Sequence, residues 1–177
     1  TTYARILDLP GTYSLNASSM DESVVVELLL NKKDKDFPDV AVVVTDVENL
    51  KRNLLLFTQV KDLNIPTILV INMADQMKRK GITLDIPLME TQLNTRIVLT
   101  STREKMGIDS LRKAILNYRA LSTEPAMDVT TIDPEYFESL QRIFPNESLY
   151  KLWLVITQDV NFSKLDRQRV SDATAFK

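Results

Sequence analysis

The sequence predicts an α/β fold with a doubly wound, mostly parallel sheet, followed by a small helical domain. Three observations predict it. Apolar, β-branched runs alternate with amphipathic helical patterns between residues 40 and 119. Those runs are continuous rather than alternating, which is typical of strands covered on both faces. After Leu121 the β-branched runs stop while helical spacing continues. We therefore expect one domain over residues 1–120 and a second over residues 121–177.

The first third of the chain is expected to begin with a strand and a helix. Residues 3–9 are rich in strand-forming side chains and stop at Pro10–Gly11, a pair that favours a turn. Ser19 and Glu22 have the spacing of a capping box before an aliphatic run, which predicts a helix over residues 20–33.

The middle of the chain repeats a strand and helix alternation. Further strands are expected at residues 40–45, 66–71 and 96–100. Helices are expected at residues 48–63, around 84–93 and at 108–119, where apolar side chains recur every three or four positions. The residues that follow the strand at 66–71 are expected to form a polar loop.

The last third of the chain is expected to be a polar linker and two helices. Residues 122–131 are polar and contain a proline, whereas Asp133–Pro134 has the form of a helix cap and continues in helical period to Phe144. Over residues 147–157 the apolar side chains fall on one face. That stripe, Leu149, Leu152, Trp153 and Ile156, is expected to be bundle core, the alternative being an exposed docking surface.

Composition excludes several classes of function. Hydrophobic residues make up 44% and charged residues 26% of the 177 positions, the balance of a soluble globular protein. The net charge of −2 argues against nucleic acid as a partner. Because the sequence contains no cysteine and no histidine, disulfides, thiolate metal sites and imidazole catalysis are excluded. No apolar run approaches the roughly 20 residues that span a bilayer.

Three short polar stretches follow predicted strands, where a doubly wound sheet binds its ligand. The first, Asp8-Leu-Pro-Gly11, has the DxxG form in which GTPases place a carboxylate near Mg²⁺, usually through water, and a glycine amide near the γ-phosphate. Taken alone it is more simply a turn. It makes Asp8 and Gly11 candidate nucleotide-site residues, with Asp8 as the candidate Mg²⁺ ligand.

The second stretch is Asn72-Met-Ala-Asp75. The Asp75 carboxylate can accept two hydrogen bonds from the N–H groups on the pairing edge of guanine, which adenine does not offer in that geometry. Asn72 would tie neighbouring loops together, and Met73 could cover the face of the base. The simpler reading of this stretch alone is a helix cap or a loop.

The third stretch is Thr100-Ser-Thr102, whose backbone amides would meet the guanine carbonyl, so that Ser101 and Thr102 need only be small. It carries little information by itself. The order and spacing of the three stretches, at successive strand ends separated by helices, favour a GTPase-type origin.

Longer stretches resemble one family, the ferrous iron transport protein B (FeoB) family. Asp8-Leu-Pro-Gly-Thr-Tyr-Ser-Leu15, the run 46–56 with its Arg-Asn-Leu core, and methionine within Asn72-Met-Ala-Asp75 are similar to that family. The resemblance covers residues 1 to about 120. It implies GTP or GDP and Mg²⁺ as cofactors, a cytosolic G domain of the small-GTPase type, and a following helical domain. It also implies membrane segments of the same parent polypeptide as partners, at the cytoplasmic face of the cell inner membrane.

One part of the family pattern is not found. No GxxxxGK[S/T] phosphate loop occurs, and only Gly11, Gly81 and Gly107 are present in the 177 residues. We expect an N-terminally truncated fragment, soluble as given, rather than a natural pseudo-GTPase, and we expect it to bind or hydrolyse GTP poorly. The strand before that loop is usually central, so its loss would leave two strands without a neighbour.

Other readings stay open. The chain could derive from another G-domain protein, such as a ribosome-assembly GTPase, or act through its C-terminal helices as a nucleotide-independent interaction module. The sequence identifies no residue that would position the attacking water. It is compatible with an oligomer but does not specify one.

Overall fold

Parallel strands form the centre of the molecule. The computed structural model describes residues 3–16 and 20–157, and within them three strands pair in the order β1-β2-β3. These are β1 (Ala41–Asp46), β2 (Thr67–Asn72) and β3 (Arg96–Leu99). Ala41 lies opposite Thr67, and Ile68 lies opposite Arg96. Because all three run in one direction, their carboxyl ends meet at the same edge of the sheet.

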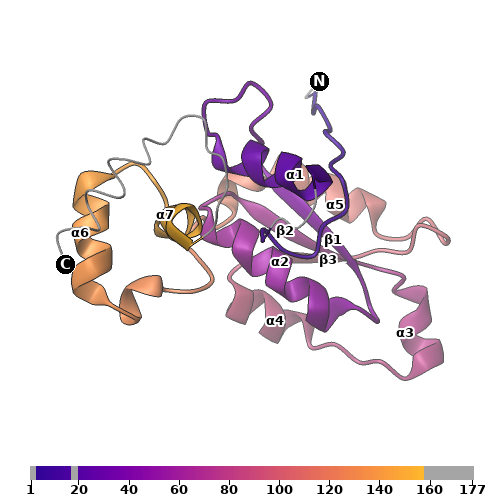
Figure 1. Ribbon diagram of the computed structural model, residues 1–177. Helices are drawn as coiled ribbons and strands as arrows, with labels where there is room; N and C mark the ends of the chain where they lie inside the picture. The colour runs from indigo at the N-terminus through magenta and orange to yellow at the C-terminus, as the bar shows by residue number, and fades with distance from the viewer. Residues whose placement is uncertain (1–2, 17–19, 158–177) are drawn as a thin grey trace.

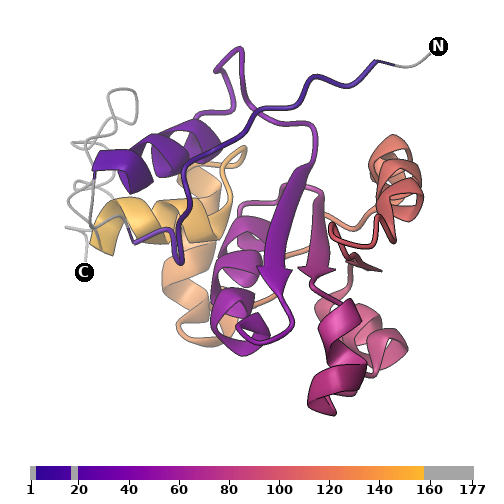
Figure 2. The ribbon, with the colours of Figure 1, turned by 90° about the vertical axis from the view of Figure 1, so that its right-hand side faces the viewer.

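Helices cover both faces of this sheet, which confirms the doubly wound fold (Figures 1 and 2). One face packs against α1 (Met20–Leu30) and α2 (Leu50–Asp62), with α4 (Ile86–Leu93) adding partly buried side chains to the same core. The other face packs against α5 (Ile108–Leu116), which a short 3-10 helix, η1 (Tyr118–Ala120), follows. The central strand β2 is buried from Thr67 to Ile71, as its continuous apolar run predicts.

The expected strand at residues 3–9 is wrong. This segment has no strand partner among the described residues. Its last residue, Leu9, packs against the main core, whereas Tyr3 is 90% and Ile6 86% exposed. Strand-forming side chains favour an extended backbone, but a strand is held by the ladder of a neighbour. Within the described residues, β1 also pairs on one side only, with β2.

A helix replaces the polar loop that we expected after β2. Helix α3 (Asp75–Lys80) begins at the aspartate of the second candidate stretch and ends at Gly81, which has a φ of 67°. Asp85 then caps α4 by accepting a hydrogen bond from the backbone N–H of Leu88. The side chain of Asp75 is therefore placed by the first turn of a helix.

The C-terminal part contains α6 (Pro134–Ile143) and α7 (Leu149–Thr157), preceded by a short 3-10 helix, η2 (Val129–Thr131). Asp133 caps α6 as expected, accepting from the N–H of Tyr136. Phe137, Leu140 and Leu152 are buried between the two helices, whereas Trp153 is 40% exposed. The stripe is thus largely core, although the side chain of Ile156, like Ser19 of the expected capping box, lies outside the described residues.

Helix α7 also belongs to the main core. Leu154 is buried in the cluster that includes the sheet, and Tyr150 packs against that cluster. The expected linker is attached to α2: Lys61 donates to the Ser122 carbonyl, and Asp62 accepts from two backbone amides of the linker, those of Ala126 and Met127. A separate domain over residues 121–177 stays a prediction.

Candidate nucleotide site

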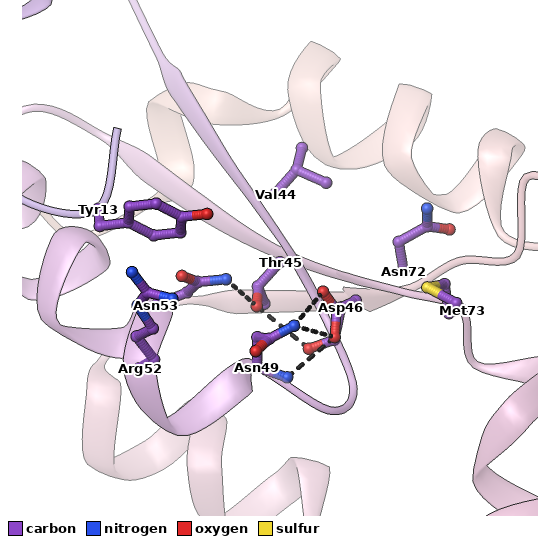
Figure 3. Close-up of a pocket in the computed structure, with 9 residues that line it drawn as sticks. All are labelled: Tyr13, Val44, Thr45, Asp46, Asn49, Arg52, Asn53, Asn72 and Met73. Atoms are coloured by element: carbon purple, nitrogen blue, oxygen red, sulfur yellow. Dashed lines mark hydrogen bonds between the residues drawn. The ribbon is translucent and has the colours of Figure 1, made fainter. Parts of the chain in front are cut away.

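A hollow of about 510 Å³ lies at the carboxyl ends of β1 and β2. Its walls come from the segment before α1, from β1, from the first turns of α2 and from the residues that end β2 (Figure 3). The lining side chains are those of Tyr13, Val44, Thr45, Asp46, Asn49, Arg52, Asn53, Asn72 and Met73. Polar groups dominate this list, so the hollow offers hydrogen-bond donors and acceptors at the edge where such sheets bind ligands.

Asp46 organises the β1 side of the hollow. Its Oδ1 accepts from the backbone amides of Glu48 and Asn49, each at 2.9 Å, and the Asn49 side-chain amide donates to Oδ2 at 2.9 Å. The Asn49 side-chain hydrogen bond, with the backbone hydrogen bonds, holds the pKa of Asp46 below its ordinary value. The carboxylate therefore fixes the turn that leads into α2.

Two further contacts tie α2 to its surroundings at the hollow. The guanidinium of Arg52 lies 3.7 Å from the centre of the Tyr13 ring, a cation–π contact between α2 and the segment that follows Gly11. Asn53 donates to the hydroxyl of Thr45 at 2.8 Å and so joins α2 to β1 (Figure 3).

The structure brings Asp75 and Ser101 together, although they are 26 residues apart. The Ser101 hydroxyl donates to Asp75 Oδ1 at 2.7 Å, and Arg103 Nε lies 3.9 Å from Oδ2. The Asp75 side chain is 9% exposed, whereas that of Arg103 is 73% exposed. A carboxylate has about four acceptor positions, so Oδ2 and the second lone pair of Oδ1 are still able to accept. Ser101 therefore orients the Asp75 carboxylate and leaves acceptor positions on it available.

Asn72 joins the ends of β2 and β3. Its Oδ1 accepts from the Thr100 hydroxyl at 3.2 Å and from the Thr102 amide at 3.3 Å, which is the tie between loops that the sequence predicts. Met73 follows with a φ of 60°, the left-handed conformation that bulky residues rarely adopt. This backbone turn lets Met73 line the hollow while Asp75 begins α3.

The loop after β3 is closed on itself. The Ser101 amide donates to the Met106 carbonyl at 3.1 Å, and the Met106 amide donates back at 3.0 Å. The amides of Ser101 and Thr102 are therefore engaged with protein groups, and presenting them to a base requires those hydrogen bonds to exchange. Gly107 ends the loop with a φ of 82°, and a Cβ there would lie 2.1 Å from the Leu99 carbonyl oxygen. Only glycine fits this close approach.

Asp8 and Gly11 stand apart from this group. Both are exposed, and Asp8 makes no hydrogen bond or ion pair with another described residue. Tyr13, two residues after Gly11, is the part of this segment that reaches the hollow. No group of three or more acidic side chains gathers as a metal site within residues 3–16 and 20–157.

Comparison with known proteins identifies the family. A family model described as "Ferrous iron transport protein B" matches residues 1–115, more than half of the chain. The chain belongs to the ferrous iron transport protein B (FeoB) family. An Fe(2+) transporter FeoB from Leptospira biflexa is 35% identical over 108 residues, which are 61% of this chain and 15% of that protein. The match to Fe(2+) transporter FeoB of Escherichia coli K12 is 31% over 147 residues, or 80% of this chain and 18% of that protein.

Solved FeoB structures have the same fold. The FeoB G-domain from Methanococcus jannaschii is 38% identical, with a TM-score of 0.59 over 63% of this chain and 69% of that one. The cytosolic domain of Thermotoga maritima FeoB in a GDP form has a TM-score of 0.75 over 96% of this chain and 73% of that one, at 22% identity. The chain spans less than a fifth of the length of the two FeoB transporters compared above. In the part that the structure describes, no helix is both long and apolar enough to cross a bilayer.

Several residues of the candidate site were not singled out from the sequence. Asp46, Asn49 and Arg52 belong to a stretch that carried the family resemblance, but no role in the site was assigned to them. The signal available was a run of polar residues directly after a buried strand. The contacts of Tyr13 and Arg103 join residues far apart in sequence, which periodicity does not report.

Proposed function

We propose that this chain is the guanine-nucleotide-binding region of a ferrous iron transporter, in which the β2 and β3 ends recognise the base. The observation that carries the proposal is the Asp75 carboxylate, largely buried and held by Ser101 beside Asn72. The GDP form of the Thermotoga maritima relative is consistent with it. The parent transporter would place this region at the cytoplasmic face of the inner membrane, joined to its membrane segments.

Recognition of guanine follows from hydrogen-bond polarity. The free acceptor positions of Asp75 match the N1–H and amino group of guanine, whereas adenine presents a bare ring nitrogen at the equivalent position and is rejected. Met73 offers apolar surface for one face of the base. Arg103 must swing away from Oδ2, which its 73% exposure allows.

Asp8 and Gly11 are proposed for the phosphate end. Mg²⁺ sites commonly use one or two carboxylates, with phosphate oxygens and water completing the shell, so a single exposed carboxylate at Asp8 suits the ion. When bound, Mg²⁺ neutralises phosphate charge. Asp8 would hold it through water, and the Gly11 amide would meet the γ-phosphate.

The 177 residues by themselves should not turn over GTP. Phosphoryl transfer depends on positioning and on charge neutralisation at the β- and γ-oxygens, and the GxxxxGK[S/T] sequence that supplies amides, a lysine and a metal ligand is not present in them. Losing one preorganised donor costs about 3 kcal/mol in other enzymes, and here several would be lost together.

Two measurements on the 177-residue chain test these proposals. Ligand-observed NMR should show a preference for guanine over adenine nucleotides that Asp75→Ala removes and Asp109→Ala retains, since Asp109 is an exposed aspartate on α5. Equal binding of both bases by the wild type would refute the proposed site. Phosphate release with Mg²⁺ and K⁺ should stay at background, and turnover that disappears in Asp75→Ala would contradict the second proposal.

A further inference from the structure

The two contacts of the Asp75 carboxylate with the loop after β3 differ in kind. The Ser101 hydroxyl donates to Oδ1 at 2.7 Å, whereas Arg103 approaches Oδ2 with its Nε at 3.9 Å. Ser101 and Asp75 are largely buried, but the side chain of Arg103 is mostly in water. The first contact is therefore a buried hydrogen bond, and the second is a loose ion pair with one end in solvent.

The Ser101 contact has a fixed direction. The hydroxyl oxygen of Ser101 accepts from the backbone amide of Glu104 at 3.2 Å, so its own proton is directed to Asp75. This hydrogen bond occupies one acceptor position on Oδ1. What a ligand finds on the other oxygen, Oδ2, therefore depends on Arg103.

The backbone that carries Arg103 is held on both sides. Before it, the Thr102 amide donates to the Asn72 side chain at 3.3 Å. Around it, Ser101 and Met106 exchange two backbone hydrogen bonds that close the loop. Arg103 therefore starts from a defined position, and rotation of its side chain is enough to bring the guanidinium to the carboxylate or to remove it.

A guanidinium resembles the pairing edge of guanine. In both groups, N–H donors stand on two nitrogens that are bonded to one carbon, and this pair of donors matches the two oxygens of a carboxylate. Adenine has no such pair on its pairing edge. The guanidinium of Arg103 is thus a group within the chain that seeks the same oxygen as the base.

We propose that Arg103 is an internal competitor for the base, which pairs with Asp75 in the empty site and which guanine must displace. The inference rests on the proposed function of this site and adds a residue that sets its affinity. A largely buried carboxylate is costly without a partner, so Arg103 stabilises the empty site. The same contact lowers the affinity for every ligand that needs Oδ2.

Guanosine is the probe that isolates this effect. It carries the base without phosphates, so removing a positive charge does not weaken binding through phosphate attraction. Binding to the 177-residue chain would be measured by ligand-observed NMR. Arg103→Gln should raise the guanosine affinity roughly two- to fivefold, the factor that corresponds to the loss of an exposed ion pair.

Arg112→Gln is the matched control for this substitution. Arg112 is also exposed, and it pairs with Asp109 on α5, outside the proposed site. The control removes the same charge from the chain, so it should leave the guanosine affinity unchanged.

Ionic strength gives a second readout, which a purely structural role of Arg103 would not move. Salt screens exposed charge pairs, with a Debye length of about 10 Å at 0.1 M and about 3 Å at 1 M. Guanosine is uncharged, so its affinity for the wild type should rise with KCl toward that of Arg103→Gln. The affinity of Arg103→Gln should change little, and Arg112→Gln should follow the wild type.

The contact can also be followed without a ligand. Relaxation of the Nε–H signal in NMR reports the motion of an arginine side chain. For Arg103 this motion should be faster in Asp75→Asn than in the wild type, whereas that of Arg112 should not change. Equal motion of Arg103 in both proteins would show that Asp75 does not hold it and would overturn the proposal.

The binding results separate this proposal from the site on which it rests. Guanosine affinity that depends on Asp75 but is equal in Arg103→Gln and Arg112→Gln would leave the base site standing and refute the competition. Weaker binding by Arg103→Gln would make Arg103 a contact of the base, which also overturns the proposal. If guanosine bound neither the wild type nor Arg103→Gln, the base site itself would be refuted.

Discussion

Replacing Asp75 by asparagine should change which base the site selects. The Oδ1 atom of an asparagine can still accept from the Ser101 hydroxyl, now 2.7 Å from the carboxylate, so the side chain should keep its orientation. The amide nitrogen then takes the place of Oδ2, opposite Arg103. A donor would face the N–H groups of guanine, whereas the C2 carbonyl of xanthine could accept from it.

The size of the effect follows from the bonds that are exchanged. Guanine loses two hydrogen bonds to a charged acceptor, each worth about 1.5–3 kcal/mol. Because water competes at an open site, we take the lower end of that range for each. The loss is then about 3 kcal/mol, or roughly a hundredfold in guanine affinity. The affinity for xanthine nucleotides relative to guanine nucleotides should therefore rise by roughly the same factor.

Competition in ligand-observed NMR measures this reversal. Guanosine and xanthosine nucleotides would be mixed with the wild type, with Asp75→Asn and with Asp109→Asn, whose exposed carboxylate lies outside the site. The ratio of their signals should invert only in Asp75→Asn. If guanine were still preferred in that variant as in the wild type, Asp75 would not contact the base, and the proposed orientation of the site would be wrong.

Three further predictions concern the stability of the fold. Gly107→Ala should lower the free energy of unfolding by about 3 kcal/mol, because the new Cβ would meet the Leu99 carbonyl. Gly81→Ala has open space around it, so its positive φ alone should lower the free energy of unfolding by about 1 kcal/mol. Urea unfolding checks both, and equal losses would contradict the close approach. Asp62→Ala should cost about 2 kcal/mol by leaving two amides without an acceptor, whereas Asp62→Asn keeps an Oδ1 for both and should stay within about 1 kcal/mol of wild type. Burial raises the pKa of Asp62 above 3.8, so the folded state favours the protonated carboxyl. The contribution of Asp62 to stability is therefore largest below pH 3.8 and declines as the pH rises through the folded pKa. Unfolding measured from pH 4 to 8 should show that decline in wild type and less of it in Asp62→Asn.

The strands of the sheet could be predicted from sequence because their burial is a local property. Residues 40–45, 66–71 and 96–100 contain apolar, β-branched runs, which are typical of strands covered on both faces. This holds fully for β2, whereas Val44 of β1 is 61% exposed. The structure places β1, β2 and β3 there, with bounds that differ by one residue. Residues 3–9 have similar side chains, yet no ladder holds them, so the pattern alone overestimated their structure.

The base end of the site could be predicted in the same way. Parallel strands align their carboxyl ends, so Asn72 and Thr102 had to be near each other once the strands were assigned. The partners that the sequence could not indicate are those joined across the fold. The 44-residue separation of Leu15 and Gln59, and the contact of Asp62 with residues 126 and 127, depend on how helices pack rather than on any local period.

The two ends of the proposed nucleotide site are prepared to different degrees. At the base end, Asn72, Asp75 and Ser101 are held by hydrogen bonds between 2.7 and 3.3 Å, and Gly107 permits the loop to close against β3. At the phosphate end, Asp8 is exposed and makes no such bond with a described residue. Preorganised groups bind without first being ordered, whereas groups that must be ordered on binding lose affinity in proportion. In the proposed site, selectivity for the base would therefore be separable from affinity for the phosphates. The first would depend on the β2 and β3 ends, and the second on ordering of the Asp8–Gly11 segment.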